Sequence, residues 1–205
     1  MSGDHGHHPE APSGFEARTL ALESLLVEKG LIASAAVDQV VAAFEQDIGP
    51  MRGARAVARA WVDPEFKKRL VNNPAQALAE IGIMGYGVEQ LVVVENTPSV
   101  RNVIVCTLCS CYPYSVLGLP PTWYKSAPYR SRVVLEPRAV LSEMGLELPD
   151  NVDLRVWDSS ADLRYMVLPE RPRGTEGMSE ERLAALVTRD CMIGVADPAV
   201  PAAVR

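Results

Sequence analysis

The stretch Val103-Ile104-Val105-Cys106-Thr107-Leu108-Cys109-Ser110-Cys111 decides the fold prediction, because a run of β-branched residues leads directly into three cysteines. β-branched side chains favour strands, so the run predicts a buried strand that ends at the first cysteine. Three of the four cysteines of this 205-residue chain fall within six positions, and we call residues 106–111 the claw. In a chain expected to be cytoplasmic, such crowding indicates metal binding or catalysis rather than a disulfide framework.

Three further apolar runs predict strands on either side of the claw. Residues 91–94 and the run before the claw are separated by Asn96-Thr97-Pro98-Ser99, which predicts two buried strands joined by a turn. Residues 152–157 and 163–168 predict another strand pair around a turn at residues 158–161. The prolines and glycine that follow the claw interrupt any regular pattern, so a rigid loop is expected there.

Helical periodicity dominates the first 82 residues and returns near the C-terminus. Apolar residues at helical spacing, with prolines at first helical positions, predict helices at the following places: 15–30, 34–44, 52–61, from 64, 75–81, 137–144, and after the capping residue Ser179. The predicted class is α+β, with an N-terminal helical arm before a layered αββα-type domain that carries the claw at a strand end. The predicted divisions are a disordered tail (1–14), the helical arm and helices (15–82), and a metal-binding catalytic domain (83–205).

The net charge and the hydropathy of the sequence argue against nucleic acids and membranes as binding partners. The formal net charge is -6 and the isoelectric point is near 5.2, which argues against a nucleic-acid or anionic membrane surface. No apolar run approaches the roughly 18–20 residues of a membrane span, and the N-terminus lacks the pattern of a secretory signal. A cytoplasmic protein is expected. His5, His7 and His8 are expected to be solvated, with weak metal binding as the alternative.

The spacing of the claw favours a ligand set that includes backbone nitrogen. Tetrahedral zinc needs four ligands, and the remaining cysteine, Cys191, lies 80 positions after Cys111. If the sulfurs of Cys109 and Cys111 bind one ion, the amide nitrogens of Ser110 and Cys111 close five- and six-membered chelate rings with them. That gives a planar N2S2 set, with Cys106 as an axial thiolate and a sixth position open. Deprotonated amides and thiolates suit low-spin trivalent iron or cobalt better than zinc.

Two other interpretations of the claw stay open at this point. The cysteines could be small buried apolar residues at a strand end, since cysteine is among the most buried residue types. They could also form part of an iron–sulfur or zinc site shared with another chain.

Six motifs resemble those of the α-subunit of nitrile hydratase, and the resemblance covers nearly all of the chain after the N-terminal tail. They are VCTLCSCYP (105–113), LGLPPTWYK (117–125), YRSRVV (129–134), VWDSS (156–160), RYMVLPERP (164–172) and LVTRD (186–190). Thr107 is similar to the cobalt members of that family, where the iron members carry serine. The resemblance implies one Co(3+) per α-subunit, with Fe(3+) as the alternative.

The resemblance also implies residue roles. Cys106 would be a thiolate, Cys109 a sulfinate and Cys111 a sulfenate, with the amides of Ser110 and Cys111 as further metal ligands. Catalytic roles fall to Cys111 and Arg164, the latter because oxidised sulfurs are anionic. The implied reaction is hydration of a nitrile to its carboxamide at a Lewis-acidic ion. The implied partners are a β-subunit in an αβ or α2β2 assembly and a cobalt activator protein.

Departures from the family pattern bear on the substrate. Tyr114 stands where a tryptophan is usual and is expected to line the substrate pocket, and Met178 replaces another tryptophan. Residues 85–87 stand where many members carry a glutamine. Cys191 is expected to be a buried structural thiol. The alternative functions are the cobalt subunit of thiocyanate hydrolase, which shares the cysteine motif, and a non-catalytic metal-binding redox subunit.

Overall fold

A computed structural model describes residues 14–42, 44, 49–85, 87–109 and 111–200. The contacts between residues divide the chain into two compact units, residues 1–43 and 44–205. Two helices form the described part of the first unit, α1 (Gly14–Glu28) and α2 (Ser34–Ala42). Gly30 follows α1 with φ of 67°, a left-handed conformation that glycine adopts without strain. The two helices predicted at 15–30 and 34–44 are present, and the predicted tail, apart from Gly14, lies outside the described residues.

The second unit begins with three short helices whose starts follow from the sequence. These are α3 (Pro50–Val62), α4 (Pro64–Asn72) and α5 (Pro74–Glu80), each with proline in its first turn. The carboxylate of Asp63 accepts hydrogen bonds from the backbone N–H groups of Glu65 and Phe66, both at 3.0 Å. Asn73 caps α5 in the same way, through the backbone N–H of Gln76.

All four predicted strands are present, but their predicted pairing is wrong. The strands are β1 (Leu91–Glu95), β2 (Val100–Val105), β3 (Asp153–Asp158) and β4 (Arg164–Leu168). β1 pairs with β4 and β2 pairs with β3, both in parallel. Parallel neighbours need a long crossover, which the helical segment between β2 and β3 supplies. β2 is buried from Arg101 onward, as expected for a strand covered on both faces.

The segment after the claw is helical where a rigid loop was expected. It contains α6 (Tyr114–Leu117), the 3-10 helix η2 (Thr122–Lys125) and α7 (Ala127–Leu135), followed by the predicted α8 (Pro137–Glu143). The hydroxyl of Ser126 accepts a hydrogen bond from the backbone N–H of Tyr129 and so caps α7. The prolines and Gly118 lie at helix ends instead of interrupting helices, and their number hid the short helices between them.

Two short helices close the chain. Ser179 caps α9 (Glu180–Ala184) as predicted, through the backbone N–H of Arg182. The sequence did not predict α10 (Arg189–Ile193), which Thr188 caps. Gly194 ends α10 with φ of 99°, and a Cβ there would lie 2.0 Å from the carbonyl oxygen of Asn102. That approach requires glycine, and it packs the end of α10 against β2.

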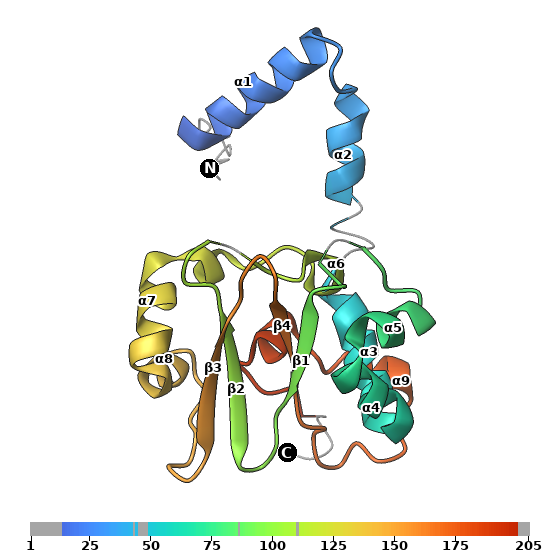
Figure 1. Ribbon diagram of the computed structural model, residues 1–205, viewed down its shortest axis with the longest axis vertical. Coiled ribbons are helices and arrows are strands. Elements are labelled where there is room, and N and C mark those ends of the chain that lie inside the picture. Colours follow the sequence, from blue (N-terminus) through green and yellow to red (C-terminus); the bar gives the residue numbers. More distant parts are fainter. Residues whose placement is uncertain (1–13, 43, 45–48, 86, 110, 201–205) are drawn as a thin grey trace, which may run out of the picture. The chain divides into compact units, whose positions relative to one another are not determined.

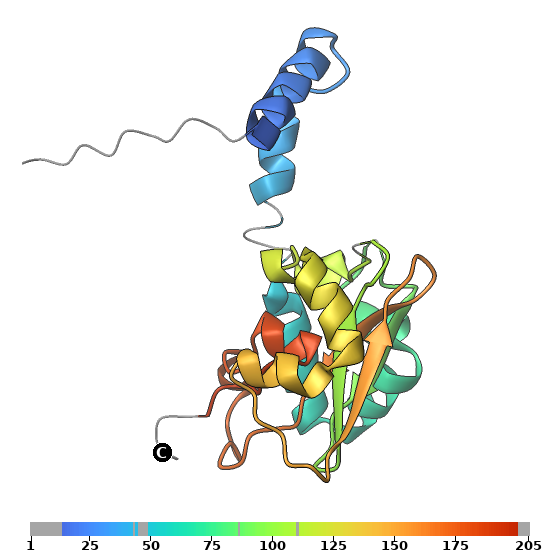
Figure 2. The same cartoon turned by 90° about the vertical axis from the view of Figure 1, so that its left-hand side faces the viewer.

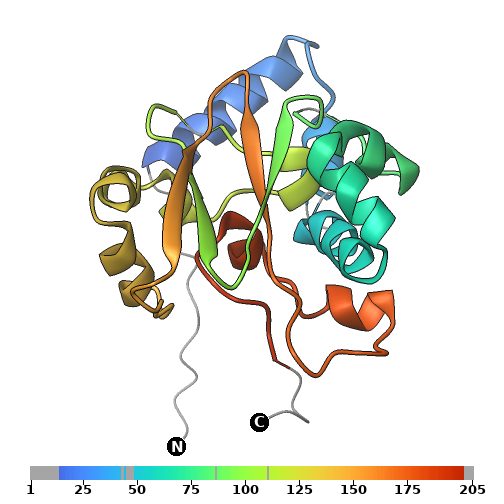
Figure 3. The same cartoon turned by 60° about the horizontal axis from the view of Figure 1, so that its bottom comes forward.

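Within the second unit, helices flank the strands on both sides (Figure 1). α7 and α8 lie beside β3, and α3, α4 and α5 lie beyond β1. Figure 2 shows α7 and α8 beside β3, and the strands pass between the two helical groups in Figure 3. The layered α+β prediction is confirmed, while the predicted division after residue 82 stays a prediction. Among the described residues, no helix has the length and apolar character needed to cross a bilayer.

Candidate metal centre

Strand direction brings three chain segments to one end of the second unit. The last residue of β2, Val105, lies in register with the last residue of β3, Asp158. A short turn then leads to Arg164 at the start of β4. Because β2 and β3 are parallel, their carboxyl ends share an edge with the turn after β3. The claw therefore begins beside residues that are more than 50 positions away in the sequence.

Three thiols converge at this edge. The Sγ atom of Cys109 lies 3.2 Å from that of Cys106 and 3.0 Å from that of Cys111, and all three atoms lie within 4.8 Å of one another. Cys106 is buried, Cys111 is half-buried and Cys109 is exposed. The set is therefore anchored in the core at one end and open at the other. Ser110, the predicted fourth ligand residue, lies outside the described residues.

The spacing of the sulfurs fits a common metal ion. For metal–sulfur bonds near 2.3 Å, two ligands at right angles lie about 3.3 Å apart, whereas two tetrahedral ligands lie about 3.8 Å apart. The two shortest sulfur–sulfur distances, 3.0 and 3.2 Å, are closer to the right-angled value. The backbone N–H of Cys109 also approaches the sulfur of Cys106, at 3.3 Å. Donor type and spacing thus fit an octahedral or square-planar ion better than tetrahedral zinc.

Burial and crowding make the half-buried thiol harder to ionise. Desolvation, followed by the neighbouring sulfurs of Cys109 and Cys106, raises the pKa of Cys111 to about 12. Like charges placed together disfavour ionisation, so the ion-free claw makes this thiol harder to deprotonate than an ordinary cysteine. A bound cation supplies the opposite influence, which is how metal binding couples to proton release.

Asp158 fastens the first turn of the claw to β3. One of its carboxylate oxygens accepts a hydrogen bond from the backbone N–H of Thr107 at 2.9 Å, and the other accepts from the Thr107 hydroxyl at 2.6 Å. Hydrogen bonds to a carboxylate are stronger than neutral ones. The motif around Asp158 was noticed in the sequence, but its role was not, because the contact joins residues far apart in the chain.

Two tyrosine hydroxyls bind backbone carbonyls of the claw and of the strand that leads into it. The hydroxyl of Tyr124 donates to the carbonyl of Cys111 at 3.2 Å, and the hydroxyl of Tyr129 donates to the carbonyl of Ile104 at 2.7 Å. Tyr124 and the buried Tyr112 pack edge to face, with ring centroids 5.1 Å apart. Burial raises the pKa of Tyr124 and of Tyr129, so both remain neutral donors.

Two arginines lie at this end of the strands with different partners. Arg130, on α7, donates through Nη1 to the carbonyl of Cys109 at 3.2 Å. Sequence reasoning missed this contact, and its only local signal is the motif at residues 129–134. The predicted Arg164 is 5% exposed, and its Nη1 donates to the carbonyl of Ala161 at 3.2 Å and lies 3.4 Å from the side-chain oxygen of Gln90.

Gly87 makes room for Arg164. A Cβ at residue 87 would lie 3.0 Å from the Cδ atom of Arg164, and φ at Gly87 is 85°. A larger residue is therefore disfavoured at that position on both steric and conformational grounds. Gln90, three positions later, supplies the glutamine side chain that contacts Arg164 in this chain.

The remaining predicted residues have clear positions. Tyr114 begins α6, is half-buried, and packs edge to face against Tyr112 with ring centroids 5.6 Å apart. Cys191 is buried in α10 with its sulfur 3.0 Å from the hydroxyl of Thr188. The predicted burial of Cys191 is confirmed.

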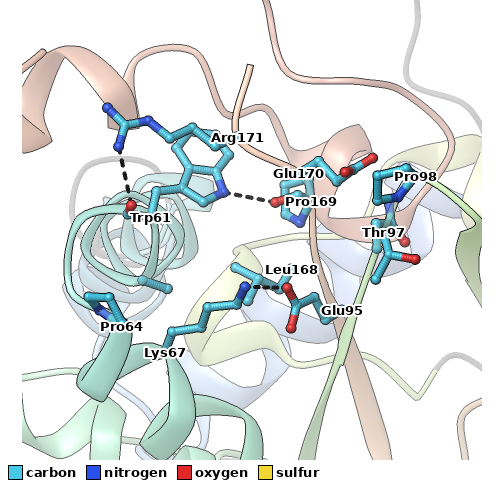
Figure 4. A pocket seen from close by; sticks show the side chains of 12 residues that line it. Trp61, Pro64, Lys67, Glu95, Thr97, Pro98, Leu168, Pro169, Glu170 and Arg171 are labelled. Carbon is cyan, nitrogen blue, oxygen red and sulfur yellow. Dashed lines mark hydrogen bonds and ion pairs between the residues drawn. The ribbon is translucent and has the colours of Figure 1, made fainter. Parts of the chain in front are cut away.

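A cavity of about 430 Å³ lies at the opposite end of the second unit, where β1 and β4 end (Figure 4). Its polar groups mostly bind one another: Lys67 pairs with Glu95, and Trp61 donates from its indole N–H to the carbonyl of Pro169 at 2.8 Å. Arg171 donates to the carbonyl of Trp61 at 3.2 Å. Its described lining contains neither thiol nor imidazole. The claw, and not this cavity, is therefore the candidate centre.

Comparison with known proteins agrees with this assignment. Residues 13–196 match the family model described as nitrile hydratase, alpha chain. The chain is 53% identical over 196 residues to the low-molecular weight cobalt-containing nitrile hydratase subunit alpha of Rhodococcus rhodochrous, covering 96% of this chain and 95% of the relative. It is 44% identical to thiocyanate hydrolase subunit gamma of Thiobacillus thioparus, over 92% and 82% of the two chains.

A solved structure extends the similarity to the fold. A double mutant of the Fe-type nitrile hydratase from Comamonas testosteroni Ni1 superposes with a TM-score of 0.88 at 44% identity, covering 94% of this chain and 96% of that one. The family match covers most of the chain, and the matched region contains every described residue of the claw. The chain belongs to the nitrile hydratase α-chain family.

Proposed function

We propose that this chain is the metal-binding subunit of a cobalt nitrile hydratase, which adds water to R–C≡N to give R–CO–NH2. The observation that carries the proposal is the convergence of the three claw sulfurs within 4.8 Å, inside a region that matches the family model. The claw would hold the ion through the sulfurs of Cys106, Cys109 and Cys111 and the amide nitrogens of Ser110 and Cys111. When bound, a trivalent ion supplies Lewis-acid chemistry toward the nitrile or water.

The protein's own groups then have distinct tasks. In the proposed mature form Cys109 is a sulfinate and Cys111 is a sulfenate, so the claw presents anionic oxygens. The Cys111 sulfenate oxygen attacks the nitrile carbon or takes a proton from the attacking water. Asp158, through Thr107, and Tyr124, through the Cys111 carbonyl, hold the claw in place while this occurs.

Two further residues complete the proposed site. Arg164 lies at the same end of the strands and adds positive charge near the anionic claw. Tyr114, at the start of α6, is the proposed wall of the nitrile pocket. Its ring is smaller than the tryptophan usual at this position and carries a hydroxyl, so the accepted range of nitriles is expected to differ from that of tryptophan-bearing members.

Cobalt is the proposed metal, with one Co(3+) per chain and Fe(3+) as the alternative. Thr107 in the claw and the cobalt-containing relative at 53% identity support cobalt. The iron alternative is kept because an Fe-type enzyme shares the fold at 44% identity. Irving–Williams affinity does not select a trivalent ion, so we propose that a cobalt activator protein assists loading.

A β-subunit is the proposed partner, in an αβ or α2β2 assembly located in the cytoplasm. The first unit supports such a partner because apolar residues on α1 are exposed: Phe15 at 82% and Leu22 at 59%. Large exposed apolar side chains of this kind typically mark a protein–protein interface. The α-chain alone is expected to be inactive, because the family resemblance places two further arginines of the site on the β-subunit.

The test is co-expression with a β-partner in cobalt medium, followed by assay with acetonitrile and acrylonitrile. Amide formation by the cobalt-loaded complex is expected. No amide despite full cobalt loading would refute the nitrile hydratase assignment. Thiocyanate is assayed in parallel because the thiocyanate hydrolase relative is 44% identical, and preferential thiocyanate hydrolysis would favour that function.

A further inference from the structure

Arg130 reaches the claw from a short and well-anchored helix. Its Nη1 atom donates to the carbonyl oxygen of Cys109 at 3.2 Å. The start of α7 is fixed by the Ser126 cap, and the neighbouring Tyr129 hydroxyl is bound to the carbonyl of Ile104 in β2. The helix that carries Arg130 is thus anchored to β2, the strand that leads into the cysteines, and no other chain is needed to bring the guanidinium there.

Arg130 keeps a further donor close to the claw. The side chain is half-buried, and its Nε atom is inaccessible to solvent with no hydrogen-bond partner among the described residues. A buried N–H without an acceptor is costly, so such groups are rare unless they serve a role. The guanidinium cannot be deprotonated in a protein, so the positive charge is always present.

The negative charge of the metal-loaded claw gives the Arg130 guanidinium a role. One thiolate, one sulfinate, one sulfenate and two deprotonated amides carry more negative charge than a trivalent ion neutralises. The oxygen that Arg130 contacts belongs to the peptide bond between Cys109 and Ser110, whose nitrogen is a proposed ligand. Peptide resonance spreads charge from that nitrogen to the carbonyl oxygen. The neutral hydrogen-bond acceptor seen at Cys109 therefore becomes an anionic one, and the bond strengthens.

We propose that Arg130 is a positioning residue that holds the Cys109 carbonyl and stabilises the metal-loaded claw with a positive charge from the same chain. The inference rests on the proposed function in one respect, namely the set of claw atoms that would bind the metal. Arg164 donates to Gln90 and to the carbonyl of Ala161, which are different partners from the Cys109 carbonyl that Arg130 binds.

The experiment compares Arg130→Met with Arg132→Met in the cobalt-loaded complex with the β-partner. Arg132 is a matched control because it lies on the same helix and carries the same charge. It pairs instead with Glu136 at 2.5 Å and Glu143 at 2.6 Å. Cobalt release into excess chelator is followed together with the visible thiolate-to-metal charge-transfer band. Melting of the metal-free chains reports folding separately.

Arg130→Met is expected to release cobalt at least about tenfold faster than the unchanged protein, with a shifted charge-transfer band. Arg130→Lys, which keeps the charge, is expected to recover part of the retention, and Arg132→Met is expected to retain cobalt normally. Equal retention by Arg130→Met and the unchanged protein would overturn the inference. If Arg130→Met fails to fold, normal retention and an unchanged band in Arg130→Lys and Arg130→Gln would overturn it.

The outcome is separable from that of the proposed function. Nitrile hydration is assayed in the unchanged complex, whereas the inference is decided by metal retention and the absorption band. An unchanged complex that lacks activity but loses cobalt on Arg130→Met substitution would refute the function and support the role of Arg130.

Discussion

The two ends of the strands use their polar groups in opposite ways. At the carboxyl ends of β1 and β4, Lys67 and Glu95 satisfy each other and Trp61 is held by a carbonyl, around a cavity of about 430 Å³. At the carboxyl end of β2, three sulfurs are crowded together, and the pKa of Cys111 is raised to about 12. Ionisable groups of one kind that are crowded together without an opposite charge are typical of a functional site. Groups of opposite charge that pair with each other typically stabilise the fold.

The largest expected effect is the loss of a claw thiol. Cys109→Ser should lower both cobalt content and nitrile hydration more than about 100-fold, because a hydroxyl is a poor substitute for a thiolate toward such an ion. Cys191→Ser is the control, since Cys191 is buried and bound to Thr188 away from the claw. Metal analysis and amide production measure both variants. Equal losses of cobalt and activity in the two variants would show that the claw cysteines are no more important for metal binding than Cys191.

The next effect concerns the carboxylate that fastens the claw. Asp158→Asn keeps the shape but replaces one acceptor oxygen with an amide donor, so the double contact with Thr107 is lost. Cobalt affinity is expected to fall about tenfold, as for other residues that orient metal ligands. Asp153→Asn, at the other end of β3, disturbs only an exposed pair with Arg155 and is the control. Indistinguishable cobalt affinities would show that Asp158 is not needed to hold the claw.

At the cavity end, a substitution should affect stability and leave chemistry intact. Trp61→Phe removes the hydrogen bond to the Pro169 carbonyl and is expected to reduce the free energy of unfolding by about 1 kcal/mol. Denaturant unfolding and steady-state kinetics measure the two properties. A fall in nitrile hydration with normal cobalt content would mean that the cavity end takes part in function, and the contrast between the two ends would fail.

The smallest effect is a pH-dependent one at the start of α4, which forms one wall of the same cavity. Hydrogen bonds from the backbone N–H groups of Phe66 and Glu65 hold the pKa of Asp63 below its usual value. A lowered folded-state pKa gives stability that is present above the unfolded-state pKa and is lost as pH falls through the folded-state pKa.

Asp63→Ala is therefore expected to melt a few degrees lower than the unchanged chain at neutral pH, and the difference should shrink in acid. Glu65→Gln, which alters only an exposed pair with Lys68, is the control. A difference that persists unchanged at low pH would contradict the capping explanation.

Structural elements that depend on neighbouring residues could be predicted from the sequence, whereas contacts between distant parts of the chain could not. The β-branched run before Cys106 and the acid or amide before each helix-starting proline act on their immediate neighbours, so they predicted β2, α4 and α5. The partner of each strand depends on chain segments far apart, and the predicted pairing was wrong for that reason. The contacts of Asp158 and Arg130 with the claw were missed for the same reason. Helices α7 and α10 were missed because they are short and preceded by residues that also mark loops.

The central claim is that the claw is a mature metal site with oxidised cysteines, and mass spectrometry of the peptide spanning residues 106–111 tests it most directly. In the active, cobalt-loaded complex, two added oxygen atoms on Cys109, one on Cys111 and none on Cys106 are predicted. Cys191, in its own peptide, should remain an unmodified thiol. An active complex whose claw peptide carries no added oxygen would contradict the claim.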